Sequence, residues 1–163
     1  GKYEAEPRKY KDLGEFFPQI VAYLNDYAAH YDQHMEAIKA EADVKRRKEE
    51  EKMAAWKEKG PKIVSMSPAN GAADVPADIN AIVIKFDRPM SQGFSMLNLR
   101  PNSYPVVRGN PHYDVESKVL TVNVKLEPGK EYVIGLNNIE YNSFRSADGV
   151  PLYPVVYTFK TKS

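Results

Sequence analysis

The sequence predicts an antiparallel β-sandwich preceded by one long α-helix. From Ile63 onward, apolar and polar residues alternate in short segments. Pro and Gly interrupt these segments at roughly ten-residue intervals, which is typical of antiparallel sandwiches and barrels. Before Gly60, apolar residues instead recur at three- and four-residue steps, which places them along one side of a helix. We therefore expect a helical segment over residues 1–59 and an all-β domain over residues 60–163.

The helix is predicted over about residues 15–59. Pro18 suits its first turn, where the missing N–H is not needed, and no further Gly or Pro follows before Gly60 and Pro61. Pro61 ends the helix because it cannot continue the hydrogen-bond ladder and biases Gly60 away from helical geometry. At about 1.5 Å per residue the helix is about 65 Å long. We expect the sandwich to cover only the end of the helix, through Trp56.

One face of this helix carries an apolar stripe. Its members recur over about three heptads, too far along the helix for the sandwich to cover them all. They are Phe17, Ile20, Leu24, Tyr27, Tyr31, Met35 and Ile38. We expect an upstream domain of the same protein to bury the stripe, with residues 1–59 as the end of that truncated domain or as a connector. Self-association of the chain through the helix is the other arrangement that buries it.

Alternation within the β domain predicts which side chains form its core. Every second residue of a strand points to the same face of its sheet, so the apolar rows should face inward and their polar neighbours outward. The predicted inward residues are Ile82, Ile84, Phe86, Leu120, Val122, Val124, Tyr132, Ile134, Leu136, Tyr157 and Phe159. These rows belong to two inner faces that pack together into one core.

A turn followed by a tyrosine predicts one corner of the sandwich. Pro128 and Gly129 form the turn, and Tyr132 begins the next strand. This spacing is typical of a tyrosine corner, in which the hydroxyl group bonds back to the preceding backbone. A tyrosine in that position already has its packing and its hydrogen bond. We therefore interpret Tyr132 as a structural residue and not as a ligand contact.

Two motifs open the β domain. A turn that reads S-P-A-N-G-A-A-D-V-P spans residues 67–76, and the alternating strand that follows ends in F-D-R-P-M at residues 86–90. A looser motif, S-A-D-G-V-P-L, precedes the last strand at residues 146–152. Over residues 61–163 this pattern resembles the bacterial immunoglobulin-like domain of S-layer and other secreted bacterial proteins, whereas the helix resembles no family that we recognise. The resemblance implies an Ig-like Greek-key sandwich of about seven strands, in a protein that is secreted, periplasmic or exposed on the bacterial cell surface.

Composition excludes several classes of function. The chain carries 23 Lys and Arg residues against 22 Asp and Glu residues, and the two signs are nearly balanced in each half. Such a balance argues against nucleic acid as a partner. No run of apolar residues reaches the roughly 18 needed to cross a bilayer, so we expect no transmembrane segment. The absence of cysteine removes disulfide and thiol chemistry.

The nearest approach to a metal site lies on the helix. His30 and His34 are four residues apart, and Asp26 precedes His30 by one turn, so all three share a helix face as zinc ligands do. Yet Tyr31 stands where a metalloprotease helix of the H-E-x-x-H type has its general-base Glu, and no third ligand follows nearby. We therefore expect neither a metal nor any other cofactor.

The function expected from the resemblance is that of a module, since a fold by itself fixes no reaction. The sequence contains no nucleophile elbow, Gly-rich phosphate loop or paired-carboxylate motif. We expect a non-catalytic accessory, spacer or binding module of a larger secreted or cell-envelope bacterial protein. The alternative is the C-terminal portion of an exported hydrolase, a peptidase or glycoside hydrolase, whose catalytic domain lies upstream and whose substrate the sandwich helps to position.

Overall fold

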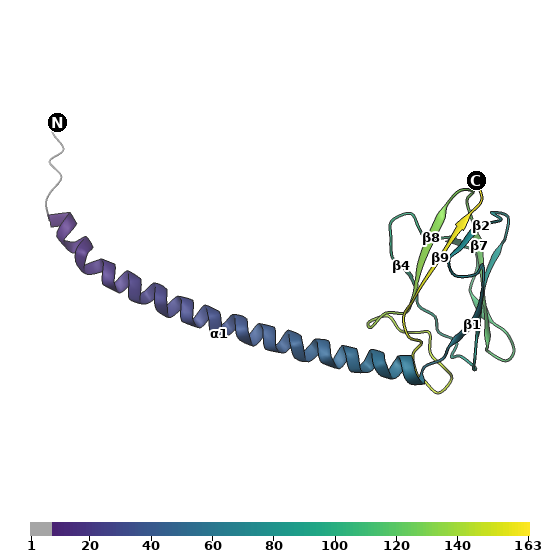
Figure 1. Ribbon diagram of the computed structural model, residues 1–163, viewed down its shortest axis with the longest axis horizontal. Helices are drawn as coiled ribbons and strands as arrows, with labels where there is room; N and C mark the ends of the chain where they lie inside the picture. Colours follow the sequence, from purple (N-terminus) through teal and green to yellow (C-terminus); the bar gives the residue numbers. More distant parts are fainter. Residues whose placement is uncertain (1–7) are drawn as a thin grey trace. The chain divides into compact units, whose positions relative to one another are not determined.

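A computed structural model describes the backbone of residues 8–163 and the side chains from Phe16 onward. One helix, α1 (Arg8–Lys59), precedes nine strands (Figure 1). The chain divides into two compact units that meet between Lys48 and Glu49. The last turns of α1 therefore belong to the same unit as the strands. We describe each unit by itself.

The helix begins earlier than the sequence predicts. Its first residue is Arg8, so Pro18 lies inside α1 and not in the first turn. The missing N–H of Pro18 removes only one bond of the ladder, to the carbonyl group of Gly14, and the residues around it continue the helix. The end of α1 at Lys59 agrees with the prediction.

Two sheets form the β part of the second unit. Its strands are β1 (Ile63–Ser67), β2 (Ala72–Val75), β3 (Ala81–Phe86), β4 (Met96–Asn98), β5 (Val106–Val107), β6 (His112–Tyr113), β7 (Val119–Lys125), β8 (Glu131–Leu136) and β9 (Val155–Thr161). One sheet has the order β1-β3-β7-β5, with β6 also paired to β7, and the other has the order β2-β9-β8-β4. The predicted sandwich is thus confirmed. The strands beyond the expected seven are β5 and β6, which have two residues each.

The chain changes sheets between β1 and β2. β1 pairs antiparallel with β3 in the first sheet, whereas β2 pairs parallel with β9 in the second. Between them, the Asn70 side chain takes the place of a neighbouring strand. Its amide group donates to the carbonyl oxygen of Val156 at 3.1 Å, and its oxygen accepts from the N–H of Thr158 at 2.9 Å. The first half of β9 is therefore bonded by a side chain instead of by β2.

The core lies between the two sheets. All eleven residues predicted to point inward are at most 3% exposed, which confirms both inner faces. Phe144 and Leu152 join this core from the long loop before β9. The ring of Phe144 lies 6.0 Å from that of Phe86. The loop therefore closes one end of the sandwich and does not lie over its surface.

Asn137 holds this loop in place. Its amide nitrogen donates to the carbonyl oxygens of Phe144 at 2.8 Å and Leu152 at 3.0 Å, and its oxygen accepts from the N–H of Phe144 at 3.0 Å. The residue is buried and has a φ of 62°, a conformation that Asn tolerates better than most residues. One side chain thus bonds three backbone groups of the buried loop, of which the carbonyl oxygen of Phe144 also accepts from the N–H of Leu152 at 2.8 Å.

Candidate interaction surfaces

The predicted tyrosine corner has the expected geometry. The hydroxyl oxygen of Tyr132 accepts from the N–H of Glu127 at 2.8 Å. Gly129 adopts a φ of 68° in the turn between Glu127 and Lys130, a conformation that glycine adopts without strain. Thr161 secures the same turn, because its hydroxyl group donates to the carbonyl oxygen of Glu127 at 2.6 Å. The ring of Tyr132 is 1% exposed, so it offers no surface to a ligand.

Of the two helix histidines, His30 makes a local contact with Asp26. The Nδ1 of His30 lies 2.8 Å from the carbonyl oxygen of Asp26 and 3.5 Å from its carboxylate. His34 is exposed as well. In the described part of the chain, no three or more His, Asp or Glu side chains gather in a way that could hold a metal ion.

The helix end is packed tightly against the loop before β9. Gly60 and Pro61 are both buried, and the N–H of Gly60 donates to the carbonyl oxygen of Trp56 at 2.9 Å. A Cβ atom at position 60 would lie 2.4 Å from that oxygen and 2.4 Å from the carbonyl oxygen of Pro151. Glycine is therefore required here by close approach, and not only as a helix terminator. Trp56 itself is half-buried.

Arg88 caps the last turn of α1. Its Nη1 donates to the carbonyl oxygen of Lys59 at 3.1 Å, one of the carbonyl groups that a helix end leaves unpaired. Asp87 holds the arginine by bonds of 3.0 and 2.9 Å and also accepts from the N–H of Lys62 at 2.8 Å. The bond from Arg88, followed by that from Lys62, holds the pKa of the Asp87 carboxyl below its ordinary value. No sequence signal links residues 59 and 88.

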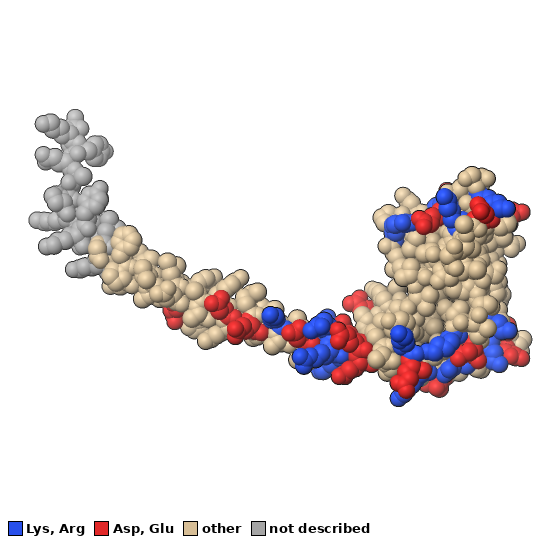
Figure 2. Space-filling model, viewed as in Figure 1, with Lys and Arg blue, Asp and Glu red and all other residues tan. Residues whose placement is uncertain are grey.

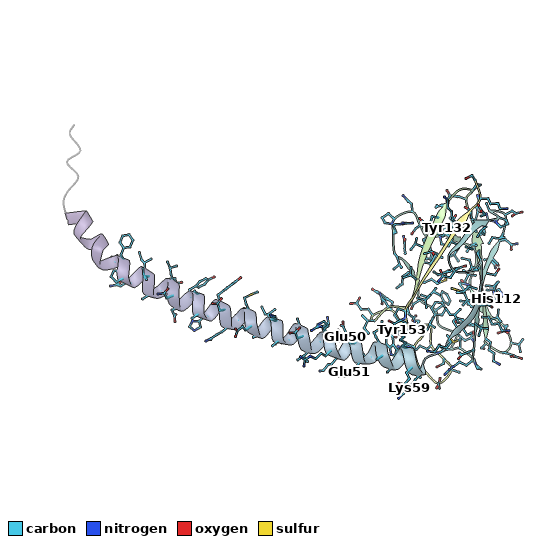
Figure 3. All side chains as sticks on the ribbon, viewed as in Figure 1. Glu50, Glu51, Lys59, His112, Tyr132 and Tyr153 are labelled. Carbon is cyan, nitrogen blue, oxygen red and sulfur yellow. The ribbon has the colours of Figure 1, made fainter. Side chains whose placement is uncertain are left out.

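A groove lies beside this helix end, and we call it the junction groove. It has a volume of about 500 Å³, and its apolar side chains are Pro61, Ile63, Met66, Leu152, Tyr153 and Val155. Figure 3 shows Tyr153 beside the last turns of α1, at the end of the sandwich away from Tyr132. The two charged residues of the groove, Lys57 and Lys62, are both basic. The sequence did not indicate this groove, because its residues come from four separate segments.

The predicted stripe is exposed along its whole length. Its seven side chains are between 44% and 64% exposed, and Phe16, Val21 and Tyr23 beside them are at least 51% exposed. The rings of Tyr27 and Tyr31 stack on each other with centroids 6.5 Å apart. We call the seven residues and these three neighbours the helix stripe. Within the described residues, no helix is both long and apolar enough to cross a membrane.

Charge is unevenly distributed along α1. Residues 16–38 contain Asp26, Asp32 and Glu36 but no Lys or Arg. The basic run at residues 45–48 follows, and Arg46 there pairs with Asp43 at 3.0 Å. Figure 2 shows the charged side chains gathered toward the C-terminal part of the helix, with a mostly uncharged length before it. The helix stripe thus occupies a separate, weakly acidic segment.

Comparison with known proteins identifies the second unit. A family model described as a bacterial Ig-like domain matches residues 57–161, which is more than half of the chain. The matched segment includes the last turn of α1 and every strand. No curated protein matches the chain significantly.

Solved structures provide more distant likenesses. CopC from Methylosinus trichosporium OB3b superposes with a TM-score of 0.46 at 18% identity, covering 63% of this chain and 93% of CopC. The S-layer protein rSbsC(31-844) superposes with a TM-score of 0.43 at 14% identity, covering 74% of this chain and 16% of that protein. Domains 1–6 of the surface layer protein SbsC superpose with a TM-score of 0.43 at 14% identity. The match covers 67% of this chain and 15% of that structure. The chain therefore spans only a small part of these two S-layer structures.

Proposed function

The chain belongs to the bacterial Ig-like domain family, and from this membership we propose that it is a non-catalytic accessory module of a larger secreted or cell-envelope bacterial protein. In this proposal the sandwich is a spacer or binding unit. The helix is the element through which it docks. The location that goes with this function is outside the cytoplasm, in the periplasm, at the cell surface or in the medium.

The observation that carries the proposal is the exposure of the helix stripe. Fully burying one large apolar side chain contributes about 1.5–3 kcal/mol relative to leaving it in water. Seven such side chains at 44–64% exposure are far more than the scattered apolar residues of an ordinary surface. Contiguous exposed apolar surface of this kind marks a protein interface. We therefore propose that a second protein surface covers the stripe.

The width of the stripe suggests what kind of surface this is. A two-helix seam needs apolar residues at only two of seven heptad positions. Here Phe16 and Tyr23 lie on one side of the central row and Val21 on the other, so the apolar face is wider. Such a face fits the groove of a helical bundle better than a single partner helix. We propose that a helical domain of the same protein, or further copies of this helix, supplies such a groove.

Sedimentation equilibrium of the chain over a range of concentrations tests the proposal. We expect association that strengthens with concentration and that Leu24→Glu abolishes, because the substitution places a charge at the centre of the stripe. Gln33→Glu is the matched control. It introduces the same residue on the opposite side of the helix, about 180° away by the 3.6-residue turn, and should leave association unchanged.

Two outcomes contradict the proposal. The first is that the chain stays monomeric at all concentrations while its helix resists proteases. The stripe would then fold back on its own sandwich. The second is association that Leu24→Glu and Gln33→Glu weaken equally, because the contact would then not depend on the apolar face.

A further inference from the structure

The junction groove is separate from the helix stripe and has the properties of a binding site. Its volume of about 500 Å³ lies within the range of about 300–1,000 Å³ that ligand pockets occupy. Ile63 and Met66 of β1 form one wall, and Leu152 and Val155, before and at the start of β9, form the other. The groove therefore provides an apolar floor between β1 and the start of β9.

The charge of the groove is positive and uncompensated. Lys57 and Lys62 line it, and no acidic residue does. The ammonium group of Lys57 lies 5.9 Å from the ring centroid of Tyr153. That of Lys62 donates to the main-chain carbonyl oxygen of Lys57, which leaves two of its three N–H donors. Neither lysine pairs with a carboxylate of any residue that the structure describes.

The strand that contributes Ile63 and Met66 to the groove has an open edge. β1 is the end strand of its sheet and, among the described residues, pairs only with β3. End strands accept an added strand from another chain, whose alternate side chains then enter neighbouring pockets. The register shift between Ile63 and Ser65 interrupts regular pairing. Only the part of β1 from Ser65 to Ser67 is regular, so an added segment is short.

From these three features we infer that the junction groove binds a short extended segment of a partner protein in which apolar side chains stand next to a carboxylate. The apolar side chains contact Met66 and Val155, and the carboxylate lies between Lys57 and Lys62. The charge of the groove selects an acidic segment over a basic one. This site goes beyond the docking role of the helix, and the two can be tested separately because they share no residue.

Titration of the isotope-labelled chain with short peptides, followed by NMR, tests this inference. The probes are acetyl-Glu-Val-Leu-Val-Glu-amide and its analogues with Gln or Lys in place of both Glu residues. We expect the Glu peptide to shift the amide signals of residues 63–67 and 152–155 saturably, and to bind more tightly than the Gln peptide. The Lys peptide should bind most weakly.

Charge reversal at Lys57 tests whether its ammonium group binds the carboxylate of the peptide. Lys57→Glu should weaken the Glu peptide by about fivefold or more, the upper range for one exposed ion pair, and strengthen the Lys peptide. Lys52→Glu changes the same charge on the same helix outside the groove and should alter neither affinity. Thermal melts of both variants check that the fold is retained, and Lys57→Gln provides a milder variant if Lys57→Glu unfolds.

The inference is overturned if no peptide shifts the signals of residues 63–67 and 152–155 up to millimolar concentration. It is also overturned if the Glu, Gln and Lys peptides bind equally, since the lysines would then serve only the helix end. Loss of self-association in Leu24→Glu should leave the titration unchanged, so failure of the helix proposal is recognised independently.

Discussion

Gly60→Ala is the substitution that most directly probes the attachment of the helix end to the sandwich. The added Cβ atom would lie 2.4 Å from the carbonyl oxygens of both Trp56 and Pro151, whereas ordinary contact begins at 3.4 Å. Neither oxygen moves freely. That of Trp56 accepts the N–H of Gly60, and Pro151 pairs with Arg145 in an isolated bridge. The loop at Pro151 must therefore move away from the helix end by about 1 Å, and the last turn of α1 must change its own backbone geometry to relieve the contact with Trp56.

Overpacking of this kind costs about 1–3 kcal/mol, and two backbone contacts place Gly60→Ala in the upper part of that range. Removing a glycine also stabilises by about 0.4–1 kcal/mol through the unfolded chain. We therefore expect a net loss of about 2 kcal/mol in the free energy of unfolding. Urea unfolding followed by the fluorescence of Trp56, the single tryptophan, measures it.

Glu58→Ala, two residues earlier and exposed, is the control for Gly60→Ala and should change the free energy by no more than about 0.5 kcal/mol. If Gly60→Ala is as stable as the unaltered chain, or more stable, the close approach to Pro151 does not exist in solution. The reasoning about the junction would then be refuted.

Three further predictions concern the second unit. Phe86→Ala or Leu120→Ala should lower the free energy of unfolding by about 2–5 kcal/mol, as measured by thermal or urea unfolding. Lys45→Ala should lower it by about 0.5 kcal/mol or less. The reverse ranking would mean that Phe86 and Leu120 do not point into the core. Asn137→Ala should lower the free energy of unfolding by about 2–4 kcal/mol, because it removes three hydrogen bonds and places alanine at a positive φ. Asn137→Gly removes the same hydrogen bonds without the strain at positive φ, so its loss should be about 1 kcal/mol smaller. Equal losses in the two variants would exclude the contribution of backbone strain. Because the folded pKa of Asp87 is lowered, its stabilisation is complete above about pH 4 and is lost as the pH falls through the folded value. The difference in unfolding free energy between the unaltered chain and Asp87→Asn should therefore shrink from pH 6 to pH 3, and a constant difference would contradict this.

Local patterns were sufficient to predict most of the fold. The rows that contain Ile82, Leu120 and Tyr157 alternate strictly because each strand has one buried and one solvated face, and that alternation is visible in a single sequence. The corner at Tyr132 was predictable for a similar reason, since its bond to Glu127 spans only five residues. The exposed helix stripe followed from periodicity alone.

Features that depend on contacts between distant segments were not predictable. The cap of α1 joins Lys59 to Arg88, and neither residue type signals it. Asn137 is polar and lies in a long loop, so sequence alone suggests a surface position, whereas tertiary hydrogen bonds bury it. The junction groove has the same origin, because segments that include Lys57 and Tyr153 meet only after folding. The start of α1 was placed too late because Pro18 is tolerated inside a helix at the cost of one hydrogen bond.

Hydrogen exchange of the helix tests the central claim, that another protein surface covers the helix stripe. Amide exchange in residues 16–38 is measured by mass spectrometry at increasing concentrations of the chain and of Leu24→Glu. The account predicts that exchange in this segment slows as the concentration of the unaltered chain rises, and that Leu24→Glu shows no such change. Identical exchange rates at every concentration in the unaltered chain would contradict it.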